Sequence, residues 1–371
     1  MKFGIITHVE HKLKEKGIFA YEPYIREMNL WAKYVDEIVI LAPKSEEKEI
    51  LRIESAYHHS KIKFIEISNF NLITFKNSVL SLFIIPRICF QIYKVMKSVD
   101  HIHLRCPGNI GLLGCFVQIL FPLKPKTVKY AGNWDPKSKQ PLSYRLQKRI
   151  LSSTFLTKNC KVLVYGKWKN QSKNIAPFFT ASYSKKEIIK INPKNLKSKI
   201  RLLFVGNFSI GKQPLLTVKV VEKLLQEKYN IQLDMFGGGV EFNRIENYIL
   251  EKELNKKVIL HGNQSKDIIK KAFQESHFLV FISKSEGWPK VVAEAMFWSC
   301  LPISSKVSCV PFMLGNGERG SIVNENITEI VIELEKYINR EELYLEKVAK
   351  AKDWSQQFTL EKFENEIKKL L

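Results

Sequence analysis

Residues 281–304 read FISKSEGWPKVVAEAMFWSCLPIS. The apolar run FLVFIS (278–283) precedes a polar loop with Ser285, Glu286 and Gly287. Pro289 suits the first turn of a helix because that position needs no amide hydrogen, and Glu294 falls little more than one turn later. A strand, a polar loop and a helix in this order predict one unit of a parallel α/β sheet.

The loop and the expected helix start together suggest an anion site between two carboxylates. The amides of Gly287, Trp288 and Lys290 would point out of the helix N-terminus, where the helix dipole favours phosphate. Glu286 and Glu294 could accept hydrogen bonds from sugar and ribose hydroxyls. A simpler interpretation remains open, in which Glu286 favours the helix start and Glu294 pairs with Lys290 at i,i+4.

The pattern of apolar runs on both sides predicts an α/β protein with two Rossmann-like domains facing across a cleft. The two sets of expected strands are 2–7, 37–43, 62–67, 101–106, 127–132 and 161–166, and then 201–206, 231–237, 257–262, 277–283, 301–305 and 320–324. We expect a first domain at 1–181, a basic linker at 182–199, a second domain at 200–352 and a final amphipathic helix at 353–371. Ligands of such sheets bind beyond the carboxyl ends of the strands.

SEGWPKVVAEAM (285–296) resembles the Glu-x7-Glu signature of glycosyltransferase family 4, the retaining group with the GT-B fold. Glu286 and Glu294 take its two acidic positions, and Gly287 and Pro289 match as well. The resemblance implies a UDP- or GDP-sugar donor held by the C-terminal half and a carbohydrate or lipid-linked acceptor. It also implies retention of the anomeric configuration, with no metal and no cofactor. The resemblance further implies that the final amphipathic helix crosses back to the first domain.

A second element that resembles the family is FVGNFSIGKQ (204–213). Lys212 takes the position of a lysine that neutralises the donor diphosphate. Asn207, after Gly206, stands where the family usually has an arginine, which puts one diphosphate contact in doubt. Asn263 in HGNQ (261–264) falls where the family places the nucleobase. The resemblance thus implies that Glu286 and Lys212 are catalytic, without naming a base.

The acceptor side is less clear in the sequence. Arg105 in RCPGN (105–109) follows an expected strand and could bind an acceptor phosphate. Asn133 and Asp135 follow another strand in GNWD and could line the same side. For Asp135 a salt bridge within the surrounding basic segment is the simpler alternative.

The net charge of +22 is concentrated in residues 121–201, which hold 20 Lys and Arg but only two acids. Such a field attracts nucleic acid, anionic lipid or diphosphate-bearing acceptors, although a solubilising surface has the same composition. We expect a membrane footprint formed by Lys124, Lys126, Lys129, Arg145, Lys148 and Arg149. Two other functions stay open, a nucleic-acid-binding protein and a sugar-nucleotide epimerase, although no nucleic-acid-binding motif is found.

The six cysteines have no metal-ligand spacing and indicate buried, reduced thiols of a cytoplasmic protein. The apolar runs 79–96 and 111–123 predict buried helices, with an interfacial surface as the alternative. No secretion signal is expected at the N-terminus. These features predict a cytoplasmic protein that is peripheral at the inner face of the membrane.

Overall fold

The computed structural model describes residues 1–371 except 48, 52, 69–74 and 192–193, and for residues 75–83 it describes the backbone only. The chain forms two compact units. Unit 1 comprises Met1–Phe178 and Phe363–Leu371, and unit 2 comprises Phe179–Lys362. Each unit contains its own parallel sheet, which confirms the predicted pair of Rossmann-like domains.

The sheet of unit 1 has seven parallel strands in the order β10-β9-β8-β7-β1-β4-β6. Most residues of its central strands are buried because helices cover both faces of the sheet. The strands are β1 (Lys2–Ile6), β4 (Glu37–Pro43), β6 (Ile62–Ile67), β7 (His101–Cys106), β8 (Lys126–Tyr130), β9 (Cys160–Tyr165) and β10 (Ile175–Phe178). Of these, the short β10 was not predicted.

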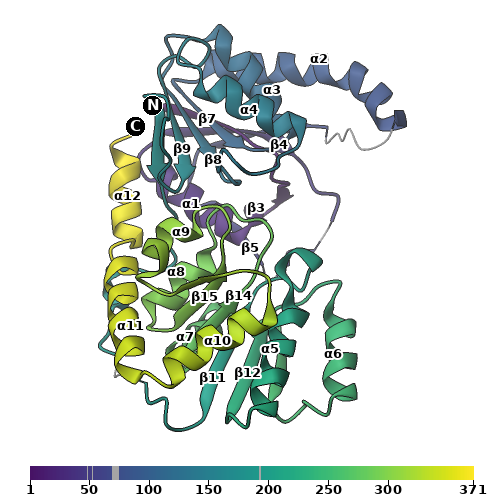
Figure 1. The fold of residues 1–371 in the computed structure, drawn as a ribbon. Coiled ribbons are helices and arrows are strands. Elements are labelled where there is room, and N and C mark those ends of the chain that lie inside the picture. The colour runs from purple at the N-terminus through teal and green to yellow at the C-terminus, as the bar shows by residue number, and fades with distance from the viewer. Residues whose placement is uncertain (48, 52, 69–74, 192–193) are drawn as a thin grey trace. The chain divides into compact units, whose positions relative to one another are not determined.

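Helices lie on both faces of this sheet (Figure 1). On one face, α1 (Glu22–Ala32) stacks Trp31 on Phe3 of β1, with 5.6 Å between the ring centroids. The other face carries a row of α2 (Phe75–Ser98), α3 (Asn109–Val117), the short 3-10 helix η1 (Gln118–Leu120) and α4 (Leu142–Ser152). These helices share one apolar core with the strands. Among the described residues, no helix is long and apolar enough to cross a membrane.

A small antiparallel sheet in unit 1 has no counterpart in the predicted strands. It consists of β2 (Lys12–Lys14), β3 (Gly17–Tyr21) and β5 (Glu54–Ala56). The buried ammonium of Lys12 lies 2.8 Å from Glu47 and 2.9 Å from Glu54 and ties the small sheet to its neighbouring loop. Strands β2 (KLK) and β5 (ESA) lack the apolar pattern on which the prediction depended.

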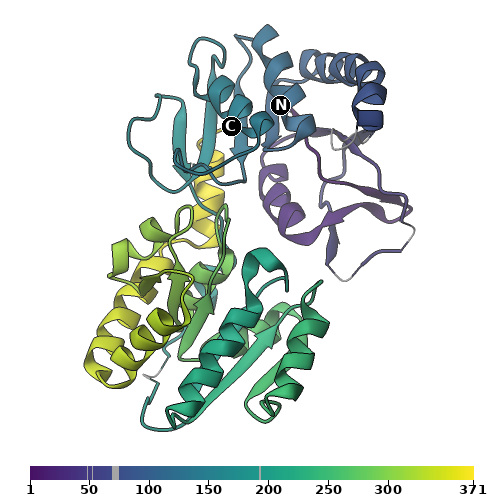
Figure 2. The same ribbon diagram turned by 45° about the vertical axis from the view of Figure 1, so that its right-hand side comes forward.

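The sheet of unit 2 has six parallel strands in the order β13-β12-β11-β14-β15-β16 (Figure 2). They are β11 (Ile200–Val205), β12 (Ile231–Phe236), β13 (Val258–Gly262), β14 (Phe278–Phe281), β15 (Leu301–Ser305) and β16 (Ser321–Val323). On one face α5 (Pro214–Gln226) packs against α6 (Phe242–Glu251) and α10 (Ile327–Ile338), and on the other α8 (Lys290–Phe297) packs against α7 (Lys266–Glu275) and α11 (Glu341–Ser355).

Two expected segments differ from the structure. Residues 182–199, expected as a linker, are part of unit 2, and there Lys194 donates hydrogen bonds to backbone carbonyls of Phe273 (3.0 Å) and Ser299 (2.9 Å). The final helix of 353–371 is instead two helices, because α11 ends at Ser355 and α12 (Leu360–Lys368) follows after a turn. The boundary between the units falls inside α12.

Candidate functional site

An ion pair joins two loops of unit 2 that follow neighbouring strands. Lys212 lies in the short 3-10 helix η3 (Ile210–Lys212) after β11, and Glu286 lies in the loop after β14. The Lys212 ammonium contacts the Glu286 carboxylate and also lies 4.8 Å from the centroid of the Phe281 ring. The structure thus brings together the two residues predicted to be catalytic.

Hydrogen bonds hold the loop after β14 in place. The Ser283 amide donates to Ser305 Oγ at 2.9 Å, and the Lys284 amide donates to the Gly211 carbonyl at 2.9 Å. The Gly287 carbonyl accepts from Ser308 Oγ at 3.0 Å. Glu286 therefore lies on a backbone that is fixed on both sides, and only about 9% of its side chain is exposed.

Helix α8 begins one residue later than expected. Pro289 is its N-cap and Lys290 its first residue, and the Val292 amide bonds to the Pro289 carbonyl at 3.0 Å. Gly287 and Trp288 thus precede the helix, so their amides are not helix amides as the sequence suggested. The positive end of the α8 dipole still lies at its N-terminus, next to the loop that carries Glu286.

Two glycine turns lie close together at the ends of β11 and β12. A Cβ on Gly237, at φ +138°, would lie 1.9 Å from the Gly206 carbonyl oxygen, so only glycine fits there. Asn207 Oδ1 would lie 2.6 Å from a Cβ on Gly239, and Asn263 Nδ2 would lie 3.5 Å from one on Gly238. Both asparagines are exposed at the carboxyl edge of this sheet.

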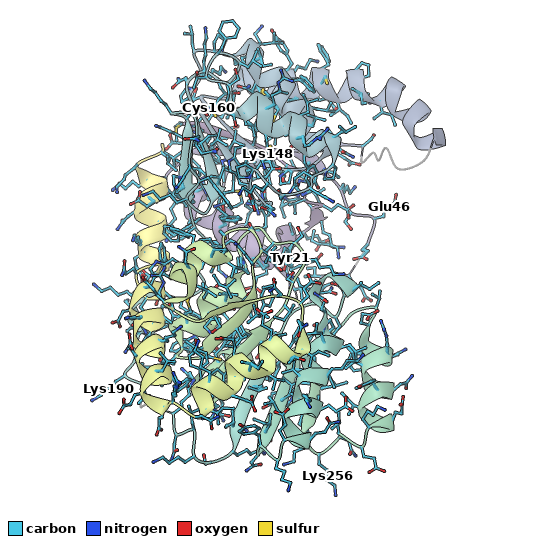
Figure 3. All side chains as sticks on the ribbon, in the orientation of Figure 1. Tyr21, Glu46, Lys148, Cys160, Lys190 and Lys256 are labelled. Carbon is cyan, nitrogen blue, oxygen red and sulfur yellow. The ribbon has the colours of Figure 1, made fainter. Side chains whose placement is uncertain are left out.

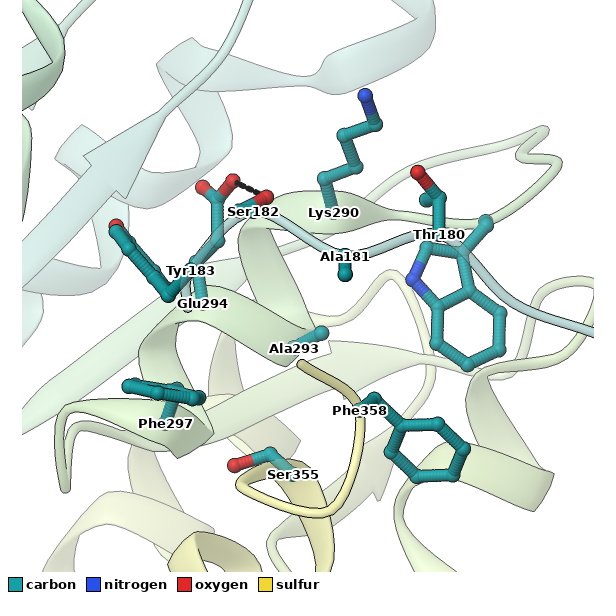
Figure 4. Close-up of a pocket in the computed structure, with 11 residues that line it drawn as sticks. Thr180, Ala181, Ser182, Tyr183, Lys290, Ala293, Glu294, Phe297, Ser355 and Phe358 are labelled. Atoms are coloured by element: carbon teal, nitrogen blue, oxygen red, sulfur yellow. Dashed lines mark hydrogen bonds between the residues drawn. The ribbon is translucent and has the colours of Figure 1, made fainter. Parts of the chain in front are cut away.

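Glu294 has a partner that the sequence did not suggest. Its carboxylate accepts a hydrogen bond from the Ser182 hydroxyl, 112 positions earlier in the chain, and not from Lys290 (Figure 4). Lys266 donates to the Ser182 carbonyl at 2.6 Å and lies 4.8 Å from the Tyr183 ring centroid. These contacts form a pocket whose lining residues are Thr180, Ala181, Ser182, Tyr183, Trp288, Lys290, Ala293, Glu294, Phe297, Ser355 and Phe358.

Trp288 has a packing role in this pocket. Its ring is buried and lies 6.4 Å from the Trp354 ring and 6.1 Å from the Phe358 ring, measured between centroids. The aromatic side chain therefore anchors the start of α8 against the turn after α11.

Arg105, predicted to bind an acceptor phosphate, is engaged inside unit 1. Its guanidinium lies 3.5 Å from the Glu27 carboxylate and 5.5 Å from the Tyr24 ring centroid, and 15% of the side chain is exposed. Burial lowers the pKa of Arg105, but Glu27 and the neighbouring tyrosines outweigh that effect, so the pKa lies above its usual value. In the structure Arg105 is thus paired inside unit 1, and its role in binding an acceptor phosphate stays a prediction.

Asn133 and Asp135 lie after β8 and shape their own loop. Asn133 Oδ1 accepts from the Asp135 amide at 2.9 Å, and Asp135 Oδ1 accepts from the Lys137 amide at 2.8 Å. Such Asx turns leave part of each side chain exposed. No side-chain salt bridge of Asp135 is seen among the described residues, so this loop is locally structured and its acceptor role stays a prediction.

The expected membrane footprint is largely wrong in its residues. Lys126 and Lys129 are buried, and the Lys129 ammonium lies 4.3 Å from the Tyr165 ring centroid. Lys124 donates to the Met96 carbonyl at 2.7 Å, and Lys148 donates to that of Trp134 at 3.0 Å (Figure 3). Of the six basic residues predicted to form the footprint, Arg145 and Arg149 are exposed to solvent.

The cysteines agree with the expected thiols. All six are free, Cys89 is half-buried, and the other five are buried. Burial raises the pKa of Cys309 to about 12. Among the described residues no group of His, Cys, Asp and Glu side chains could hold a metal ion.

Solved structures of the same fold identify the architecture. A crystal structure of HepE from Anabaena in complex with UDP and glucose aligns over 100% of this chain and 98% of its own, with a TM-score of 0.67 and 10% identity. At that identity the likeness shows the fold alone. The fold is therefore GT-B, the two-domain fold of a class of glycosyltransferases.

Sequence comparisons agree with this class. Residues 184–354 match the family model of glycosyl transferases group 1, and they form the corresponding domain of this protein. The capsular polysaccharide biosynthesis glycosyltransferase CapH of Staphylococcus aureus is 26% identical over 59% of this chain and 63% of its own length. The GDP-mannose:cellobiosyl-diphosphopolyprenol alpha-mannosyltransferase of Xanthomonas oryzae is 25% identical over 34% of each chain. The chain thus spans less than two thirds of the length of these relatives.

Proposed function

We propose that the protein is a retaining glycosyltransferase of family 4 that moves a sugar from a UDP- or GDP-sugar to a glycan. The observation that carries the proposal is the Lys212–Glu286 pair beside the N-terminus of α8. A cation, a helix dipole and a carboxylate at one place suit a diphosphate joined to a sugar. The group 1 domain at 184–354 supports the same assignment.

In the proposed reaction the bond between the anomeric carbon and the diphosphate oxygen breaks, and a bond to the acceptor hydroxyl forms. The leaving diphosphate gains charge, and Lys212 with the start of α8 stabilises that charge without a metal ion. The acceptor hydroxyl loses a proton, for which an oxygen of the donor phosphate is the proposed recipient. Glu286 would accept hydrogen bonds from the sugar hydroxyls. Glu294 would lose its hydrogen bond from Ser182 and accept hydrogen bonds from the ribose hydroxyls instead.

The proposed acceptor is a carbohydrate or a polyprenyl-diphosphate-linked glycan of a surface polysaccharide. The supporting observations are the functions of the two relatives, one in capsular polysaccharide biosynthesis and one acting on a diphosphopolyprenol. The cationic residues 121–201 suit an anionic membrane surface, at the inner face of which a cytoplasmic enzyme would meet such lipids.

Thermal shift with UDP, GDP and their sugars tests the donor site. The correct nucleotide should raise the melting temperature through mass action. Lys212→Ala should weaken binding by about 10- to 100-fold, because a charged hydrogen bond to phosphate is lost. Glu286→Gln and Glu294→Gln should reduce the shift, whereas the exposed Glu325→Gln serves as a matched control and should not.

Unchanged shifts in all three site variants would place the nucleotide elsewhere. Product analysis then separates transfer from rival activities. Incubation with donor alone would yield an epimerised sugar nucleotide if the protein were an epimerase, and no such product is expected. The anomeric configuration of the product glycan reports retention directly.

A further inference from the structure

The outer surface of the α2–α4 layer exposes large apolar side chains. We call this surface the α2–α4 face, and its exposed apolar members are Phe90, Phe116, Leu120, Leu123, Leu142, Leu146 and Phe155. Leu123 is 89% exposed and Phe155 is 77% exposed. The same helices bury other residues, such as Ile92, Ile110 and Ile150, against the sheet. The exposed members are therefore not needed for the core, and such a concentration marks a contact surface.

Hydrogen bonds bring the most exposed members together. The Asn159 side chain donates to the Leu123 carbonyl at 2.9 Å, and the Gln118 side chain donates to the Leu156 carbonyl at 3.1 Å. The loop after η1 and the loop after α4 are thus neighbours. The half-buried Phe121 ring lies 5.3 Å from the half-buried Tyr93 ring, so the loop after η1 also packs against α2.

The charge of the α2–α4 face is of one sign. The segments α2, α3, η1 and α4 contain no Asp or Glu, and from 75 to 161 the sequence has two acids, Asp100 and Asp135. Its exposed bases are Arg87, Lys94, Lys97, Arg145, Arg149 and Lys158. Lys94 and Lys158 lie 4.4 Å and 5.2 Å from the ring centroids of Phe90 and Phe155.

An anionic bilayer offers partners for both the basic and the apolar side chains of this face. Its headgroup phosphates attract lysine and arginine, and the boundary with the acyl chains accepts leucine and phenylalanine. A nucleic acid would use the bases and stack on aromatic rings, but it would leave four exposed leucines in water. The mixture of side chains therefore favours lipid over nucleic acid.

We propose that the α2–α4 face is the docking surface of unit 1 for an anionic lipid bilayer. Leu123 and Phe155 enter the acyl boundary, while Arg145, Arg149 and the bases of α2 contact lipid phosphates. Membrane binding would then depend on a defined face and on the insertion of apolar side chains, and not only on the net charge of the protein. It concerns unit 1 alone, so it does not depend on the donor site in unit 2.

Cosedimentation with vesicles of equal parts phosphatidylglycerol and phosphatidylcholine tests the apolar contact. Leu123→Ser combined with Phe155→Ser should lower the vesicle-bound fraction by about tenfold, because both side chains lose their apolar contact. The matched control is Leu250→Ser combined with Ile332→Ser, two side chains of unit 2 that are 60% and 56% exposed. The control should bind as the wild type does.

A second pair of variants tests the charge. Arg145→Glu with Arg149→Glu should release the protein from vesicles at lower salt than the wild type. Lys190→Glu with Lys256→Glu makes the same charge change at exposed positions of unit 2 and should have a much smaller effect (Figure 3). Equal effects of the two pairs would overturn the proposal, because net charge alone would then explain binding.

Other outcomes also decide. Wild-type binding by the Leu123→Ser, Phe155→Ser variant, or tighter binding of generic RNA than of vesicles, would overturn the lipid surface. A UDP or GDP thermal shift for each variant separates this inference from the proposed transferase. A protein that retains its nucleotide shift but never binds vesicles refutes the lipid surface alone, and a protein that binds vesicles but no nucleotide refutes the donor site alone.

Discussion

Lys194 is a half-buried cation without a carboxylate partner among the described residues. Its ammonium donates to the carbonyls of Phe273, Ser276, Trp298 and Ser299 at the ends of α7 and α8. Helix C-termini carry partial negative charge, so the contact is favourable. Even so, burial lowers the pKa of Lys194 to about 8.

This pKa predicts a pH dependence of stability. Because the unfolded chain keeps a lysine pKa near its usual 10.5, it binds more protons than the folded chain between about pH 8 and 10.5. The contribution of Lys194 to the free energy of unfolding should therefore rise across this window, by on the order of 1–3 kcal/mol. Urea unfolding of wild type and Lys194→Met at pH 8 and pH 10 measures the difference.

In the same experiment Lys194→Met should be the less stable protein at both pH values, because four carbonyls lose their donor. Parallel pH curves for the two proteins would contradict the assigned titration.

At single positions, the sequence predicted contacts that follow from local motifs. It paired Lys212 with the Glu286 site through motif resemblance, and the structure places the two in contact. It could not foresee Ser182 on Glu294, because 112 positions separate them and neither residue carries a sign of the contact. It also could not foresee the ion pair between Arg105 and Glu27, because Glu27 lies far away in the sequence, on α1.

At the scale of elements, the segment 180–183 covers the face of α8 that carries Glu294. If Glu294 binds the donor ribose, Ser182 competes for the same carboxylate. Ser182→Ala should then tighten nucleotide binding by about fivefold, the worth of one modest hydrogen bond. Isothermal titration calorimetry with UDP or GDP measures the change.

The control for this variant is Ser355→Ala. Ser355 lines the same pocket, but its hydroxyl bonds to the Lys352 carbonyl and not to Glu294. Weaker nucleotide binding by Ser182→Ala, or an equal gain in both variants, would show that Ser182 does not compete with the nucleotide.

Helix α10 offers an independent test of local stability. Asn326 is its N-cap, and its side chain accepts a hydrogen bond from the Glu329 amide at 3.1 Å. Asn326→Ala should lower the free energy of unfolding by about 1 kcal/mol. Chemical denaturation measures this change. The control Asn326→Ser should retain most of the stability. An unchanged denaturation midpoint for Asn326→Ala would contradict the role of Asn326 as the N-cap.

The elements that the sequence predicted well are those with a strong apolar pattern. Parallel strands such as β14 are buried on both faces and read as unbroken apolar runs. The sequence did not predict the small antiparallel sheet because its strand β5 is three residues long and half-buried. The footprint failed because Lys126 and Lys129 point into packed regions, and charge counting along a sequence cannot distinguish an exposed lysine from a buried one.

At the scale of the whole molecule, unit 1 is built from two separate pieces of chain. Within it, Phe363 and Ile367 are buried, and the Phe363 ring lies 5.3 Å from that of Phe178. Lys33 and Tyr34 each donate to Glu364 at 2.9 Å. The sequence predicted that the C-terminus crosses back, but not that the boundary would lie within its last helix.

Removal of residues 363–371 should therefore destabilise unit 1 by about 3–6 kcal/mol, because two large apolar side chains leave its core. Urea unfolding followed by tryptophan fluorescence measures the loss. A chain shortened only by residues 369–371, beyond α12, is the control. Unfolding of both shortened chains at the wild-type urea concentration would contradict the role of this segment.

The split composition of unit 1 also determines the order of events on the ribosome. Unit 2 is a single uninterrupted stretch, Phe179–Lys362, and the piece that completes unit 1 follows it in the chain. Unit 1, although most of it is translated first, receives its closing piece last. The N-terminal domain therefore cannot complete its fold until all of unit 2 has been translated, whereas the N-terminal domain usually folds first.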